Sequence, residues 1–258
     1  GAYEAGRHQR DAMTTENAGV PTDGATAINV ALRARYAAAL KAWSGAVAGE
    51  RVSQPLLVVV PRGYVQSRVR LMIVGQETLG WGEPEWDPST YDGREKLYSW
   101  YENFDLARGR RESGSPFWQA AYKLEAALNP DGPSRSFLWT NVVPVSQDVS
   151  GTGRFGPADS EVALSACGAN LLPIEVEVTH PDAMVFFSGK SRDVYLRESF
   201  PDATLTELDP LVGELGNMPN DVIAYRTEHP RRLRALRQSA VVDQIAARIA
   251  QRLAARNA

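Results

Sequence analysis

Polar side chains that could take part in hydrolysis follow three apolar runs of the chain. Glu77 lies in a Gly75-Gln76-Glu77 turn, Asn141 ends a second run, and His229 follows a third. A carboxylate can activate water or stabilise a cation, and a histidine can hydrogen-bond a developing negative charge. A carboxamide offers both a donor and an acceptor, as the edge of a pyrimidine ring demands. The structural alternatives are a salt-bridged or helix-capping Glu77, an Asn141 that ties down a loop, and a turn histidine.

Arginines stand at positions 231, 232, 234 and 237, just after His229-Pro230. A guanidinium fork suits phosphate groups, and Arg231 and Arg232 begin this cluster. The chain has a net charge of −3 and an isoelectric point near 5.7, which argue against a protein that coats nucleic acid non-specifically. A local basic groove is compatible with these values, because binding depends on where the charges lie. The alternative is a solvated helix face.

The composition excludes several classes of site. One cysteine, Cys167, is too few for a disulfide scaffold, a multi-cysteine zinc site or a cysteine-ligated iron–sulfur cluster, and there are only three histidines. No apolar run reaches the length of a membrane span. We therefore expect a soluble, cytoplasmic monomer with no metal, no cofactor and no membrane partner.

Two phosphate-binding motifs are incomplete. Gly151–Gly156 matches GxGxxG, but Pro144 and further residues separate it from the preceding strand and Pro157 follows it. The tight strand–turn–helix that presents a pyrophosphate to a helix N-terminus is therefore missing. Ser188-Gly-Lys-Ser191 resembles the end of a phosphate-binding loop, yet Met184 stands where the first glycine is required. Neither motif predicts a nucleotide cofactor.

The elements that must position these residues alternate between strands and helices, which predicts an α/β fold. We expect a three-layer α/β/α sandwich with a central, mainly parallel four-stranded sheet. Residues 1–24 read as a disordered leader, and residues 25–258 as a single domain. The predicted strands are Val69–Val74, Phe137–Asn141, Ala183–Phe187 and Val222–Tyr225. The predicted helices are Thr26–Trp43, Ser115–Leu128, Ala158–Val178 with an interruption at Pro173, Arg192–Phe200 and a closing helix that carries Val241 to Leu253.

Residues 78–113 are too long for a purely structural connection. They hold seven aromatic residues: Trp81, Trp86, Tyr91, Tyr98, Trp100, Tyr101 and Phe104. We expect most of them to pack this insertion onto the domain. The alternative is a lid or binding wall after the first strand.

Five short motifs, taken in order, resemble the uracil-DNA glycosylase superfamily. They are the Gly75–Thr78 turn, the Pro-Phe segment within Ser115–Ala120, the strand Phe137–Val145 with Asn141, the strand Val185–Gly189, and Glu228-His229-Pro230. The resemblance spans roughly Val69 to Leu236. It departs from the family at Glu77, where the well-known branches carry Asp or Asn, and at Thr78, which replaces the usual proline. The cysteine count excludes the iron–sulfur branches. The chain therefore resembles a divergent member.

The resemblance implies hydrolysis of the bond between uracil, or another deaminated base, and deoxyribose in DNA. Such enzymes flip the nucleotide out of the stack. Phe117, or as a second choice Phe104, would stack on the base, and Asn141 would read its N3–H and O4. Glu77 would orient water and stabilise the sugar cation.

In the same scheme His229 and the backbone of Gly75 and Gln76 would contact the departing base. Arg231 and Arg232 would hold DNA phosphates, and Leu233 would fill the gap left by the flipped base or, alternatively, pack its helix. Two other functions stay open: a non-catalytic nucleic-acid-binding module with this fold, and a hydrolase of free nucleosides.

Overall fold

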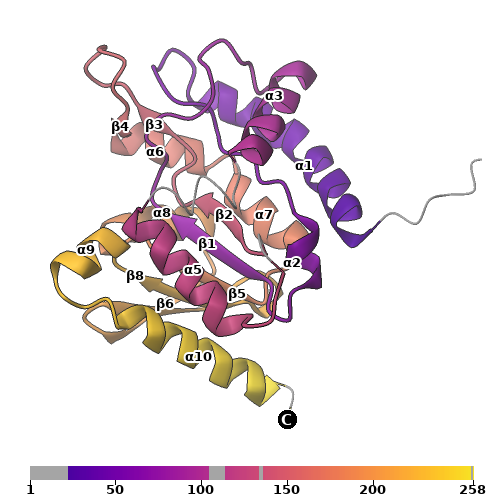
Figure 1. Cartoon of the computed structure of the whole chain (residues 1–258). Coiled ribbons are helices and arrows are strands. Elements are labelled where there is room, and N and C mark those ends of the chain that lie inside the picture. The colour runs from indigo at the N-terminus through magenta and orange to yellow at the C-terminus, as the bar shows by residue number, and fades with distance from the viewer. Residues whose placement is uncertain (1–22, 105–113, 134–135, 257) are drawn as a thin grey trace, which may run out of the picture.

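A computed structural model describes residues 23–104, 114–133, 136–256 and 258 (Figure 1). Residues 1–22 of the predicted leader lie outside this range. Helix α1 begins at Gly24, the last residue of the predicted leader, and the carboxylate of Asp23 caps it by accepting from the backbone N–H of Thr26.

The central sheet has six strands, not the expected four. In spatial order they are β2 (Leu138–Asn141), β1 (Leu71–Gly75), β5 (Ala183–Phe186), β8 (Ile223–Thr227), β7 (Val212–Gly216) and β6 (Thr204–Asp209). The first four are mutually parallel and correspond to the predicted strands. β6 and β7 form an antiparallel hairpin that extends the sheet beyond β8.

The parallel strands form where the sequence is continuously apolar. Every residue of β1 and β5 is buried, as expected for strands covered on both faces. β6 is exposed or half-buried along its whole length, and its polar sequence predicted no strand of the sheet. β7 was not predicted, because Gly213, Glu214 and Gly216 interrupt its apolar pattern.

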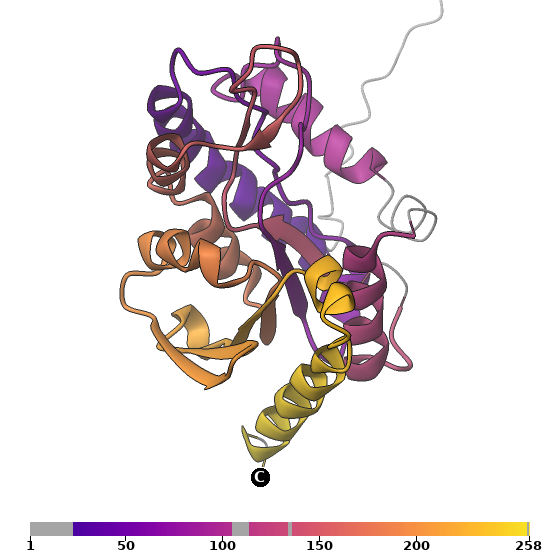
Figure 2. The same cartoon turned by 90° about the vertical axis from the view of Figure 1, so that its left-hand side faces the viewer.

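Helices lie on either side of β1 (Figure 2). Their bounds are α1 (Gly24–Ala46), α2 (Arg62–Gln66), α3 (Tyr91–Asn103), α5 (Pro116–Leu128), α6 (Ser160–Cys167), α7 (Leu171–Thr179), α8 (Asp193–Ser199), α9 (Pro230–Ala235) and α10 (Val241–Arg256). α5 packs against α9 and α10, while α1 packs against α6 and α7. A small hairpin of β3 (Ser146–Gln147) and β4 (Gly156–Pro157) lies apart from the main sheet.

The predicted helix over Ala158–Val178 is two helices, and its break is not at Pro173. The chain turns at Asn170, which adopts the left-handed conformation with φ of 61°. Pro173 lies in the first turn of α7, where a backbone N–H has no intrahelical partner to lose.

Among the described residues, Ser160–Thr179 is long and apolar enough to cross a membrane, although we expected no such stretch. It is weak evidence for a span, because the segment is divided between α6 and α7 and more than half of it is buried in the protein.

The part of the 78–113 insertion that the structure describes packs onto the sheet through aromatic rings. Trp86, Trp100, Trp81, Trp139 and Trp118 contact one another in that order, with ring centroids 4.9–6.5 Å apart, and we call them the tryptophan chain. Tyr98 and Tyr101 are also buried, and Phe104 packs on Trp81, so the expected packing role is confirmed for most of the seven aromatic residues of the insertion. Residues 105–113 lie outside the described residues.

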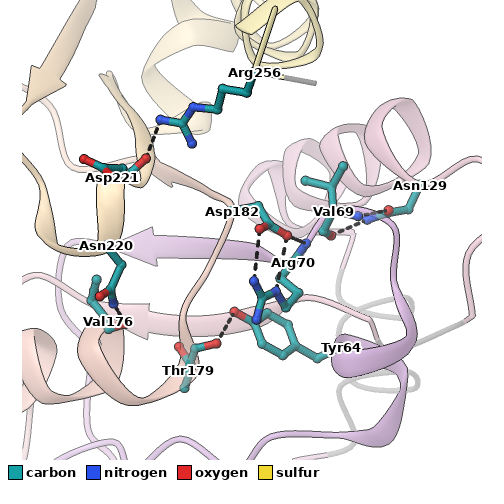
Figure 3. A network of polar contacts seen from close by, with 10 residues as sticks. All are labelled: Tyr64, Val69, Arg70, Asn129, Val176, Thr179, Asp182, Asn220, Asp221 and Arg256. Atoms are coloured by element: carbon teal, nitrogen blue, oxygen red, sulfur yellow. Dashed lines mark hydrogen bonds and ion pairs between the residues drawn. The ribbon is translucent and has the colours of Figure 1, made fainter. Parts of the chain in front are cut away.

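Polar ties close the sheet edge where β1 and β5 begin (Figure 3). The guanidinium and backbone N–H of Arg70 donate to the carboxylate of Asp182, at 2.8–3.3 Å. The carboxamide of Asn129 pairs with both backbone polar groups of Val69 at 2.8 Å. Because these polar groups are hydrogen-bonded to one another, we assign them a structural role, which is to hold the starts of the strands in place. The candidate site lies at the opposite edge, where the parallel strands end.

Candidate active site

The carboxyl ends of β1 and β2 place Gly75 and Asn141 side by side. The two residues are partners in the parallel register. A Cβ atom on Gly75 would lie 2.5 Å from Oδ1 of Asn141 and 3.4 Å from the Phe117 ring. Only glycine therefore lets the carboxamide and the phenyl ring both lie against the backbone of β1. The structure brings these three predicted site residues together.

The carboxamide of Asn141 is free to bind a ligand. The residue is only 5% exposed, and within the described part of the chain its side chain forms no hydrogen bond. An amide tying down a loop would be bonded to that loop, so this alternative has no support among these contacts. Neither polar atom of this amide is among the buried side-chain atoms that lack a partner, so water or a ligand can reach the carboxamide.

Phe117 lies between the strand ends and His229. It enters through α5, which begins with Ser115 as N-cap and Pro116 in the first turn. Its ring is parallel to the His229 imidazole, with 5.8 Å between centroids and 22° between planes. Such a separation is that of an offset pair, so the imidazole covers only part of the phenyl face. Phe104 lies one ring further away, against Trp118.

His229 caps α9 and is held as a neutral imidazole. Its Nδ1 atom accepts a hydrogen bond from the backbone N–H of Arg231 at 3.2 Å, which only an unprotonated nitrogen can do. Burial lowers the pKa of His229; the Glu77 charge raises it in part and Arg231 lowers it again. The remaining nitrogen, Nε2, therefore carries the proton and can donate.

Glu77 is salt-bridged, as one structural alternative proposed. Nη2 of Arg192 donates to Oε1 at 2.8 Å and to Oε2 at 3.0 Å, and Nε donates to Oε2 at 3.1 Å. The Glu77 side chain is 6% exposed and that of Arg192 is 17% exposed. Gln76, between Gly75 and Glu77, ties β1 to β5 by donating from its side-chain Nε2 to the carbonyl of Ser188 at 2.8 Å.

A hollow of about 590 Å³ lies beside these residues. Its lining comprises Gln76, Ser191, Glu228, His229, Arg231, Arg232 and Ala235. Two of the predicted catalytic and base-contacting residues, Gln76 and His229, thus share it with the two predicted phosphate-binding arginines. Gly75, Glu77, Phe117 and Asn141 are not part of this lining.

Three arginines of the cluster lie on the exposed face of α9, and Arg237 follows the end of that helix. Arg231 and Arg232 are exposed, and Arg232 pairs with Glu228 at 3.3 Å. Arg234 donates to Oε1 of Gln119 in α5. A partly paired, exposed cluster is compatible both with a solvated face and with phosphate binding.

Leu233, for which a wedge in DNA and helix packing were the two expected roles, is buried in this structure. Its side chain is 1% exposed and faces α5 and α10, beside Pro116 and Val242. On α9 it lies three residues after the buried Pro230, on the apolar side of the helix. Leu233 therefore has the packing role that was its alternative.

The other motifs that the sequence offered for chemistry have structural explanations. Asp148 accepts from the backbone N–H groups of Thr152 and Gly153, so the Gly151–Gly156 loop is folded around a carboxylate. Burial raises the pKa of Cys167 to about 12, which makes its thiol a poor nucleophile. In the described ranges, no three His, Cys, Asp or Glu side chains gather as metal ligands would.

Sequence reasoning missed Arg192. Its only signal is its place three residues after Gly189, where a strand ends that also carries one motif of the family resemblance. Comparison of the sequence with models of known protein families, and with curated proteins, gives no match. The resemblance to uracil-DNA glycosylases therefore stays a prediction.

Proposed function

We propose that this protein is a DNA glycosylase that hydrolyses the N-glycosidic bond of uracil or another deaminated base. The observation that carries the proposal is the unbonded carboxamide of Asn141, packed against Gly75 beside the Phe117–His229 ring pair. We include in the proposal the three-layer α/β/α arrangement of that superfamily.

The flipped base would lie on the part of the Phe117 face that the imidazole leaves uncovered. Asn141 would then donate to a ring carbonyl oxygen and accept from a ring N–H, which is the pattern that uracil offers. A cytosine would present a ring acceptor and an amino group instead. Binding the extruded base offsets part of the cost of unstacking it.

Bond cleavage would place positive charge on the sugar and negative charge on the leaving base. Nε2–H of His229, kept available by the bond at Nδ1, would donate to the base oxygen and stabilise its anion. The carboxylate of Glu77 would orient water and stabilise the sugar cation through a step that parallels glycoside hydrolysis. Water supplies the hydroxyl of the sugar product, and its proton completes the leaving base.

DNA would be held beside the hollow by Arg231 and Arg232. Such contacts position the strand without reading its sequence. The acidic net charge makes a local patch necessary for binding a polyanion.

A second candidate is a nucleic-acid-binding module without catalysis. The specific observation in its favour is the ion pair of Glu77 with Arg192, which neutralises the carboxylate. In that case Asn141 and His229 would recognise a base without cleaving it.

The test is incubation with single- and double-stranded oligonucleotides that carry uracil, hypoxanthine or xanthine, followed by detection of abasic sites. Cleavage by the wild type that is strongly reduced in Glu77→Gln supports the proposal. Binding with no abasic product favours the non-catalytic module. Hydrolysis of free deoxynucleosides alone would indicate the nucleoside hydrolase.

A further inference from the structure

Arg192 lies in the turn after β5, where its guanidinium contacts the carboxylate of Glu77. Three hydrogen bonds of 2.8–3.1 Å join the two side chains through Nε and Nη2, so the guanidinium faces the carboxylate edge-on. Fork-to-carboxylate contacts of this kind fix orientation as well as charge. The two residues are 115 positions apart in the sequence.

The backbone around Arg192 is held in place at both ends. Gly189 donates its N–H to the Thr227 carbonyl at 2.9 Å and adopts φ of 69°, which favours glycine. The N–H of Arg192 then bonds to the Gly189 carbonyl at 3.2 Å, and Gln76 bonds to Ser188. The turn is thus attached to β8 and to the residue that precedes Glu77, so Arg192 has a defined position relative to that carboxylate.

A glutamate needs such a partner more than an aspartate would. Its extra methylene adds a rotatable bond, and a catalytic carboxylate must be held close to its productive geometry. A carboxylate has about four acceptor sites, so the fork of Arg192 leaves room for a water. Removing Arg192 would leave a nearly buried carboxylate without its partner, which is strongly unfavourable, and Glu77 would turn away.

We propose that Arg192 is the positioning residue for Glu77 in base excision. This inference rests on the proposed glycosylase function. Arg192 acts through Glu77 and contacts neither the base nor the sugar. The other nitrogen of its fork, Nη1, bonds to the hydroxyl of Ser191, which holds the guanidinium from its far side.

The experiment compares single-turnover excision of uracil by the wild type, Arg192→Ala, Arg192→Lys, Glu77→Gln and the Glu77→Gln/Arg192→Ala double variant. We expect Arg192→Ala to slow excision about 100-fold, as misplacement of a reactive group does, while affinity for an abasic-site oligonucleotide is unchanged. Arg192→Lys keeps the charge and loses the fork, so its rate should lie in between. In the Glu77→Gln background, removal of Arg192 should cause no further loss.

Lys190→Ala is the matched control. Lys190 lies in the same turn but pairs with Glu207, so its removal should leave excision unchanged. Thermal unfolding of each variant shows which are folded. If Arg192→Ala does not fold, the comparison uses Arg192→Lys in its place.

Three outcomes would overturn the inference. An undiminished or faster rate in the folded Arg192 variants would show that the pair does not support excision. An additional loss in the Glu77→Gln background, or weaker DNA binding, would place Arg192 in direct contact with the substrate. A wild type that excises nothing from any oligonucleotide would instead refute the glycosylase function itself.

Discussion

Replacing Gly75 with alanine should impair base reading and leave DNA binding intact. The new Cβ would lie 2.5 Å from Oδ1 of Asn141, whereas real Cβ atoms essentially never approach within 3.0 Å, so the carboxamide must move by at least about 0.5 Å. A displacement of 1 Å can cost about 100-fold in rate, so we expect single-turnover excision to fall roughly 10- to 100-fold. Overpacking should lower the free energy of unfolding by about 1–3 kcal/mol.

The assay measures excision from a uracil oligonucleotide together with affinity for an abasic-site oligonucleotide, which has no base to read. Gly45→Ala is the matched control, because an added Cβ there meets nothing within 4 Å and the residue lies within α1. This control should be more stable by roughly 0.5–1 kcal/mol and fully active. Wild-type excision by a folded Gly75→Ala variant would refute the assignment of Asn141 as the base-reading residue.

Three further predictions concern recognition, DNA binding and stability. Asn141→Asp should weaken uracil excision by about 1–3 kcal/mol in transition-state binding and admit cytosine, since a carboxylate accepts from its amino group; unchanged kinetics would give Asn141 a structural role. Arg231→Ala combined with Arg232→Ala should flatten the slope of log affinity against log salt by about 1.8 on duplex DNA, and identical slopes would leave the cluster a solvated face. Burial raises the pKa of Glu175 to about 7, although hydrogen bonds lower it in part. The contribution of Glu175 to the stability of the fold is therefore fully present below the pKa of the unfolded chain and is lost as pH rises through 7. Glu175→Gln should therefore raise the melting temperature more at pH 8 than at pH 5, unlike the exposed control Glu177→Gln; equal shifts at both values would contradict the buried-acid interpretation.

The central strands could be predicted because their signal is local. A buried parallel strand is a continuous apolar run, and β1, β2, β5 and β8 each contain one. The β6–β7 hairpin could not be predicted in this way. Its exposed strand tolerates polar residues and glycines, and such a sequence is also typical of a loop.

Residues of the candidate site could be predicted where they directly follow a strand. They could not be predicted where a residue is bound by a side chain from a distant part of the sequence. Gly75 and Asn141 meet because parallel neighbours end together. The ion pair of Glu77 with Arg192 joins distant segments, and no local pattern marks it. The burial of Leu233 could not be predicted, because a motif gives the order of residues but not which face of a short helix is covered.

The tryptophan chain gives this protein a built-in optical reporter. Indole rings at such separations exchange excitation energy, so light absorbed at Trp86 or Trp100 can reach Trp118 and Trp139 before it is emitted. Trp118 contacts Phe117 with 4.7 Å between ring centroids, and Trp139 precedes Asn141 by two residues on β2. A base entering against Phe117 would therefore quench emission collected from all five indoles, so occupancy of the site can be followed by intrinsic fluorescence without a label.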